Sequence, residues 1–263
     1  MKTELDNQTY PKFHIAVSSV SFSKNFFLRE ELKREFPNST FNESGNQFSE
    51  NELISFLKNK DAAIVGTESI TDNVLGQTPR LKIISKYGVG LDNIDQQSLK
   101  IRNVALKWTE GVNRRSVSEL TLYFMLGLCR KAFESGNKLK KSQWEKNGGY
   151  QLTGKTVGII GCGQIGSDLI QLLAPFECNL LINDIIKKSE LCRNYNARQV
   201  DLKTLIAKSD LISLHVPLTS STKKMVNSHF LQSMKPSAYL INTCRGAVID
   251  QNILKMALRE NII

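Results

Sequence analysis

Apolar and polar positions along the chain predict an α/β protein. Short apolar runs typical of buried strands are separated by stretches in which apolar residues recur at helical spacing. In the first half, strands are expected at 13–17, 62–65, 81–85 and 104–106. Helices are expected over 26–36, from the capping box of Ser49 and Glu52 to about Leu57, and up to 102. This half is expected to form a small α/β unit of its own.

The second half begins with a longer apolar stretch, 116–133, which predicts one buried helix. A polar, basic segment, 134–149, follows and is expected to pack on another surface through Trp144. Five strands then alternate with helices, at 156–160, 179–182, 198–200, 211–216 and 238–242. This order predicts a doubly wound parallel sheet. A last helix, 251–260, is expected to lead toward a sixth strand, and the sequence ends at Ile263.

A glycine-rich turn directly follows the strand at 156–160. Its sequence, Gly-Cys-Gly-Gln-Ile-Gly, provides the GxGxxG spacing, and the next apolar strand ends at Asp184. Strand, glycine turn, helix, strand and acid together are typical of a dinucleotide-binding unit. The turn lets the backbone approach a pyrophosphate at the helix N-terminus, and the acid accepts hydrogen bonds from a ribose. We therefore predict cofactor-binding residues at Gly161, Gly163, Gly166 and Asp184.

Two further segments follow strands and could bind an anion. In 85–95, Gly88 and Gly90 allow successive amides to turn toward one point, and Lys86 adds charge. A plain glycine turn explains this pattern equally well. Arg245 lies just past the last strand, where ligands of open α/β sheets bind. It could bind a carboxylate and polarise a carbonyl, and its alternative is a surface ion pair.

The segment after the strand at 211–216 could reach the nicotinamide end of a cofactor. The residues expected to do so are His215, Val216, Pro217 and Thr222. The alternative is a strand that simply stops at Pro217. The other two histidines, His14 and His229, are expected to be structural, and no carboxylate near His215 in sequence would orient it as a catalyst.

Composition narrows the class of protein. The chain has 263 residues, 41% hydrophobic and 23% charged, with a net charge of +10. This is a globular profile, and the lysines and arginines are dispersed without interleaved aromatic residues. A nucleic-acid partner is therefore not expected, whereas an anionic substrate and cofactor suit the charge. Five cysteines without a CxxC pair predict neither a metal site nor a disulfide framework. With no apolar leader and no long apolar run, a cytoplasmic protein without a membrane partner is expected.

Taken together, these motifs resemble the D-isomer-specific 2-hydroxyacid dehydrogenases. The resemblance rests on YGVGLDNID (87–95), GVNRRSVSEL (111–120), GIIGCGQIG (158–166), HVPLTSST (215–222) and NTCRGAVID (242–250). It extends from about residue 60 to the last residue, and the most similar branch is D-3-phosphoglycerate dehydrogenase. It implies a Rossmann-type cofactor domain, 108–263, incomplete at its C-terminal end, and a smaller flavodoxin-like substrate domain, 1–107.

The resemblance also implies roles for single residues. The amides of Val89 and Gly90 match the loop that holds the substrate carboxylate, and Lys86 matches a position that is often arginine in the phosphoglycerate branch. Arg245 matches the catalytic arginine. Cofactor contacts are implied for Thr109, Gln164, Ile165, Asp184, Thr243, Cys244 and also Arg245. The family's catalytic glutamate and histidine follow the last strand of the cofactor domain, and this sequence ends before that segment.

The sequence therefore predicts an NAD-dependent oxidoreductase that interconverts a D-2-hydroxy acid, similar to 3-phosphoglycerate, and its 2-oxo acid. Asp184 should favour NAD over NADP by repelling a 2′-phosphate. The helix and basic segment over 116–149 match the family's dimerisation region, so a homodimer is expected. The alternative is a truncated, non-catalytic NAD-binding protein that acts as a sensor or interaction module.

Overall fold

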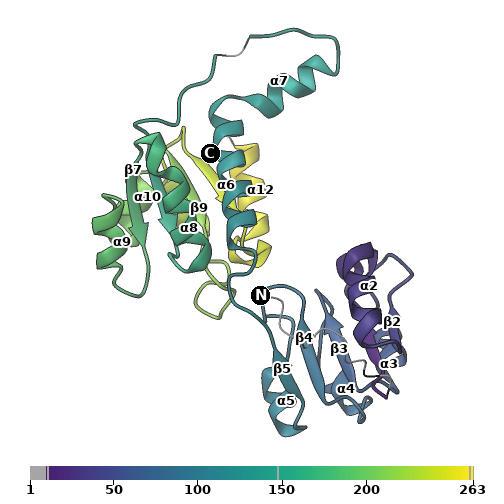
Figure 1. Cartoon of the computed structure of the whole chain (residues 1–263). Helices are drawn as coiled ribbons and strands as arrows, with labels where there is room; N and C mark the ends of the chain where they lie inside the picture. The colour runs from purple at the N-terminus through teal and green to yellow at the C-terminus, as the bar shows by residue number, and fades with distance from the viewer. Residues whose placement is uncertain (1–9, 11, 147, 261, 263) are drawn as a thin grey trace, which may run out of the picture. The chain divides into compact units, whose positions relative to one another are not determined.

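The computed structural model describes residues 10, 12–146, 148–260 and 262. The chain divides into two compact units, Met1–Val112 and Asn113–Ile263. Each unit contains one five-stranded parallel sheet flanked by helices, so both have an α/β Rossmann-like architecture (Figure 1). In Figure 1 the first unit is coloured purple to blue-teal and the second teal to yellow.

The first unit has the strand order β2-β1-β3-β4-β5, which is the flavodoxin-like order. Its strands are β1 Ile15–Val17, β2 Ser39–Phe41, β3 Ala62–Val65, β4 Ile83–Lys86 and β5 Ala105–Lys107. Its helices are α1 Val20–Lys24, α2 Phe26–Glu35, α3 Glu50–Leu57, α4 Asp72–Gly76 and α5 Gln96–Ile101. The capping box predicted for α3 is present between Ser49 and Glu52.

Apolar side chains of this unit form a core on each face of the sheet. One core joins Ala63 and Ile84 to buried leucines of α3, α4 and α5. The other joins Val17 and Phe22 to Phe41 and α2. The carboxyl ends of β3 and β4 lie next to each other, since Val65 pairs with Lys86.

The second unit has the strand order β10-β9-β6-β7-β8. When its strands are renumbered from the unit's own first strand and read from β8 to β10, the order is 3-2-1-4-5. This is the order of dinucleotide-binding sheets. The strands are β6 Thr156–Ile160, β7 Asn179–Asn183, β8 Arg198–Gln199, β9 Leu211–Leu214 and β10 Tyr239–Asn242. The strand order reverses between β6 and β9, and ligands of such sheets bind beyond the strand ends at this point.

Helices cover both faces of the second sheet. Met125, Ile159 and Leu169 belong to one core, with α6 and α8, and Ile160, Leu205 and Phe230 to the other, with α10, α11 and α12. The helices are α6 Arg114–Cys129, α7 Ala132–Leu139, α8 Gln164–Leu173, α9 Ser189–Asn194, α10 Leu202–Lys208, α11 Ser228–Gln232 and α12 Gln251–Arg259, with 3-10 turns η1 Ala174–Phe176 and η2 Gly246–Val248.

The single helix predicted over 116–133 is wrong in its extent. Helix α6 ends at Cys129, and Lys131 adopts a left-handed conformation with φ 51° before α7 begins. Apolar composition alone did not reveal this break, because no glycine or proline marks it. No helix among the described residues has the length and apolarity needed to cross a bilayer.

Candidate functional site

The glycine turn after β6 is shaped by close backbone contacts. Gly161 has φ +88°, and a Cβ placed there would lie 2.6 Å from the carbonyl oxygen of His215. A Cβ at Gly166 would lie 2.1 Å from the carbonyl oxygen of Gly161. Gly163 differs, because a Cβ there would meet no heavy atom within 4 Å. Two glycines therefore let strand, turn and helix pack together, while the third faces open space.

The open side of the turn is the start of helix α8. Gly163 is its N-cap residue and no side chain caps it, so the first amides point outward without a side-chain acceptor. The helix is held by the fully buried Leu169, Ile170 and Leu173. A fixed helix N-terminus next to open space is suited to a phosphate group. Gln164 and Ile165, predicted to contact the cofactor, are the first two residues of this helix.

Asp184 lies one residue beyond β7 and next to the glycine turn. Its Oδ2 accepts a hydrogen bond from the amide of Cys162 at 2.7 Å, and its Oδ1 accepts one from the amide of Ile186 at 2.8 Å. The ammonium of Lys188 lies 3.9 Å from Oδ2. Burial and the nearby Asp184 carboxylate raise the pKa of the Cys162 thiol to about 12. The Cys162 thiol is therefore protonated at neutral pH. The carboxylate of Asp184, which is expected to bind a ribose, is held against the glycine turn by its hydrogen bond from the Cys162 amide.

The segment after β9 is built around internal hydrogen bonds. The Thr222 hydroxyl accepts from the amide of Thr219 at 2.8 Å and donates to the carbonyl of Pro217 at 2.6 Å. Thr222 thus closes the loop that carries Val216 and Pro217. Ring nitrogen Nε2 of His215 lies 2.8 Å from the Ser213 hydroxyl. Burial lowers the pKa of His215 to about 4, so its ring is neutral at pH 7.

The lowered pKa of the half-buried His215 ring predicts a pH-dependent stability. The unfolded chain binds a proton at His215 near pH 6.5, whereas the folded chain does so only near pH 4. Stability should therefore be complete above about pH 6.5 and fall by roughly 3 kcal/mol as the pH decreases to about 4. Urea unfolding across this range should show the loss. His215→Gln should remove this part of the pH dependence, while the acid loss caused by carboxylates remains; identical slopes in both proteins would contradict the assignment.

The turn after β10 is held by Asn242. Its side-chain oxygen accepts from the amide of Cys244 at 3.0 Å, and its amide nitrogen donates to the carbonyl of Arg245 at 2.9 Å. The Arg245 guanidinium donates to the carbonyl of Cys244 at 2.9 Å. Thr243 bonds through its hydroxyl to Thr121 of α6 at 3.0 Å. The predicted Thr243, Cys244 and Arg245 therefore occupy one fixed turn at the same sheet edge as the glycine turn.

The sequence reasoning missed the side chains that hold these turns. Ser213, Asn242 and Thr121 bind predicted site residues but were not themselves predicted. Ser213 carried a usable signal, because residues two apart on a strand share a face and a hydroxyl there can reach His215. Thr121 carried none, since its partner is distant in sequence and is brought near by packing.

The remaining predicted residues, Lys86, Val89, Gly90 and Thr109, belong to the first unit. Gly88 has φ +127°, and the loop from Tyr87 to Asp92 follows β4 directly. Val89 and Gly90 are half-buried, whereas Thr109 is exposed after β5. Lys86 donates to the carbonyl of Gly66 and, at 2.7 Å, to the side chain of Asn93.

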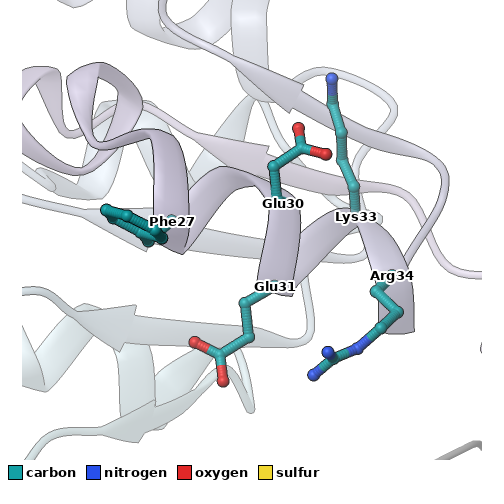
Figure 2. A pocket seen from close by; sticks show the side chains of 5 residues that line it. All are labelled: Phe27, Glu30, Glu31, Lys33 and Arg34. Atoms are coloured by element: carbon teal, nitrogen blue, oxygen red, sulfur yellow. The ribbon is translucent and has the colours of Figure 1, made fainter.

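A hollow on the outer side of α2 does not have the features of a reaction site. It is lined by Phe27, Glu30, Glu31, Lys33 and Arg34. Figure 2 shows the side chains of Glu31 and Arg34 pointing away from those of Glu30 and Lys33. Its charged groups therefore do not converge on one point. Within the described part of the chain, no group of three histidine, cysteine or acidic side chains could hold a metal ion.

Comparison with known proteins places these features in a family context. Residues 122–263 match the model of the D-isomer specific 2-hydroxyacid dehydrogenase NAD binding domain. A glyoxylate reductase of Thermofilum pendens is 37% identical over 223 residues, which cover 82% of this chain and 66% of that protein. A D-3-phosphoglycerate dehydrogenase of Methanocaldococcus jannaschii is 32% identical over 217 residues, which cover 81% of this chain and 41% of that protein. The matched region thus spans about two thirds of the reductase.

A solved structure shows the same fold. The D-lactate dehydrogenase of Aquifex aeolicus, crystallised with NAD and lactic acid, superposes with a TM-score of 0.80 and 28% identity. The match covers 95% of this chain and 74% of that one.

Proposed function

We propose that this chain, which belongs to the D-isomer-specific 2-hydroxyacid dehydrogenase family, is an oxidoreductase that interconverts a D-2-hydroxy acid and its 2-oxo acid with NAD. The observation that carries the proposal is the open glycine turn at the N-terminus of α8, with Asp184 fixed beside it. The NAD-binding domain assigned by the family model agrees with this chemistry.

The residues of the second unit fit a dinucleotide. The amides at Gly163, Gln164 and Ile165 would hold the pyrophosphate, because nothing fills the space beside Gly163. Asp184 would accept hydrogen bonds from the adenosine ribose. Residues His215, Val216, Pro217, Thr222, Thr243 and Cys244 would line the nicotinamide end. When bound, the nicotinamide of NAD accepts or donates the hydride, and the protein orients the cofactor and the substrate.

The substrate contacts are proposed from the roles that the family resemblance implies for residues of two turns, one in each unit. The Val89 and Gly90 amides would bind the carboxylate, and the Arg245 guanidinium would bind and polarise the 2-oxo group. We do not propose His215 as a general acid, because its pKa of about 4 leaves no imidazolium proton to donate at neutral pH. Its backbone carbonyl also packs closely against Gly161 of the glycine turn.

Asp184→Ala tests the ribose contact. The variant should bind NADH about tenfold more weakly and show a smaller preference for NADH over NADPH, since a carboxylate disfavours a 2′-phosphate. Titration calorimetry with both nucleotides measures the two affinities. Glu190→Ala, which removes an acid from the nearby α9, is the matched control and should leave both values unchanged. An unaltered NADH affinity in Asp184→Ala would refute the assignment.

A homodimer is proposed from the apolar surface of α6 and the segment after it. Leu120, Tyr123, Leu139 and Trp144 are exposed by 46%, 57%, 58% and 83%. Large apolar side chains exposed along one stretch of a chain are typical of an interface. Light scattering should therefore give a mass about twice the 29.6 kDa of one chain. A monomer at all concentrations would contradict this.

The identity of the acid is tested with a panel. Relatives named glyoxylate reductase and D-3-phosphoglycerate dehydrogenase support a small acid and a phosphorylated one, respectively. The loss of NADH absorbance should be followed with glyoxylate, pyruvate, hydroxypyruvate and 3-phosphohydroxypyruvate. Oxidation with at least one supports the proposal and names the substrate. NADH binding without oxidation would favour the non-catalytic alternative.

A further inference from the structure

Lys86 is the last residue of β4, directly before the loop that carries Val89 and Gly90. Its ammonium donates to the carbonyl of Gly66, at the end of β3, and at 2.7 Å to the side-chain oxygen of Asn93. At least two of its three N–H donors are therefore used inside its own unit. The family resemblance places Lys86 where a positive charge would suggest phosphate binding. In the structure, however, the Lys86 ammonium makes structural hydrogen bonds within its own unit.

Asn93 closes the other end of the same loop. Its side-chain nitrogen donates to the carbonyl of Gly66 at 3.2 Å and to that of Glu68 at 2.5 Å. Its own carbonyl accepts from the amide of Ile70 at 2.8 Å. Asn93 is thus bound on both its side chain and its backbone to the segment that follows β3.

The Gly66 end of this arrangement is itself fixed. The amide of Gly66 donates a hydrogen bond at 2.6 Å to the Oε2 atom of Glu68, a residue that is only 1% exposed. The amide of Tyr87 donates to the carbonyl of Val65 at 2.8 Å. Both ends of the loop 87–92 are therefore attached to Val65, the last residue of β3, and to the buried Gly66 that follows it.

We propose that Lys86 and Asn93 form a clasp on Gly66 that holds loop 87–92 in the conformation in which the Val89 and Gly90 amides bind a carboxylate. Lys86 is then a positioning residue and not a phosphate ligand. This inference rests on the proposed function, because it assumes that the loop binds the substrate carboxylate.

The two roles of Lys86 predict different patterns of affinity. If Lys86 were a phosphate ligand, it would strengthen the binding only of acids that carry a phosphate. If Lys86 acts as a clasp, it strengthens the binding of every carboxylate that the loop binds. The reason is that hydrogen bonds from a charged group are among the stronger ones that order a loop. Hydroxypyruvate and 3-phosphohydroxypyruvate differ only by the phosphate and therefore separate the two roles.

The test is an NMR titration of the amide signals of Val89 and Gly90 in the full chain with each of these acids. Lys86→Met should weaken both affinities by the same factor, about tenfold. Lys82→Met is the control, because it removes the same charge from an exposed lysine of the same unit. It should bind both acids like the unchanged chain. Asn93→Ala should reproduce the effect of Lys86→Met, and the double variant should lose little more.

Three results would overturn the inference. Selective loss of the phosphorylated acid in Lys86→Met would make Lys86 a phosphate ligand. Unchanged affinities in Lys86→Met, with binding by the unchanged chain, would contradict the clasp alone. If neither acid shifts the Val89 and Gly90 signals in the unchanged chain, the substrate assignment of the proposed function fails together with the clasp.

Discussion

Gly166→Ala is expected to destabilise the second unit and to abolish NADH binding. The new Cβ would lie 2.1 Å from the carbonyl oxygen of Gly161, a distance that forces helix α8 away from the glycine turn. Because the obstructing atom is backbone, the cost is expected at the upper end of the roughly 1–3 kcal/mol typical of overpacking. Urea unfolding measures the stability, and titration calorimetry measures the binding.

Gly163→Ala is the matched variant that separates folding from binding. A Cβ at this position meets no heavy atom within 4 Å, and Gly163 is an N-cap residue without a positive φ. The folded chain should therefore lose only about 1 kcal/mol of stability, the cost of a poorer N-cap residue. NADH affinity should nevertheless fall by about tenfold or more, because the methyl group occupies the space proposed for the pyrophosphate. Normal binding by Gly163→Ala would show that the pyrophosphate lies elsewhere.

Arg245→Ala is expected to remove turnover of any 2-oxo acid. The guanidinium would supply the charged donors to the oxygen on which negative charge develops, and losing one such donor costs about 10²–10³-fold in rate. Arg245→Lys should recover only part of this loss, because an ammonium cannot donate two parallel hydrogen bonds from a fixed plane. Steady-state kinetics with the preferred acid of the panel measures both.

NADH affinity controls for damage to the turn in these variants. The side chain of Asn242, which holds the turn, bonds to the backbone of Cys244 and Arg245, so the turn should persist without the guanidinium. Both Arg245 variants should therefore bind NADH nearly as tightly as the unchanged chain. Turnover retained in Arg245→Ala would place the reacting oxygen at another residue.

Local constraints explain why the glycine turn could be recognised from sequence. Gly166 is required by its close approach to the carbonyl oxygen of Gly161 within the turn, Gly161 by its own positive φ, and Asp184 follows the neighbouring strand. Chain order and spacing are therefore enough to predict their placement. The same holds for α3, since Ser49 and Glu52 of its capping box are three residues apart.

Features that depend on contacts between distant segments were not predictable in this way. The strand β2, Ser39–Phe41, was missed because only Phe41 of its three residues is apolar and buried. The role of Lys86 depends on Gly66, which lies beside it only because β3 and β4 pair with Val65 opposite Lys86. In sequence, a lysine before a glycine loop indicates an anion ligand and a structural contact equally well.

The reaction proposed for this chain is hydride transfer between NADH and C2 of a 2-oxo acid. The most direct measurement uses NADH carrying deuterium at both positions of nicotinamide C4, with the acids of the panel, and determines deuterium in the product by mass spectrometry. We expect one deuterium at C2 of a 2-hydroxy acid, and no such product with Arg245→Ala. Tight NADH binding at the glycine turn, with all acids recovered unreduced and unlabelled, would contradict it.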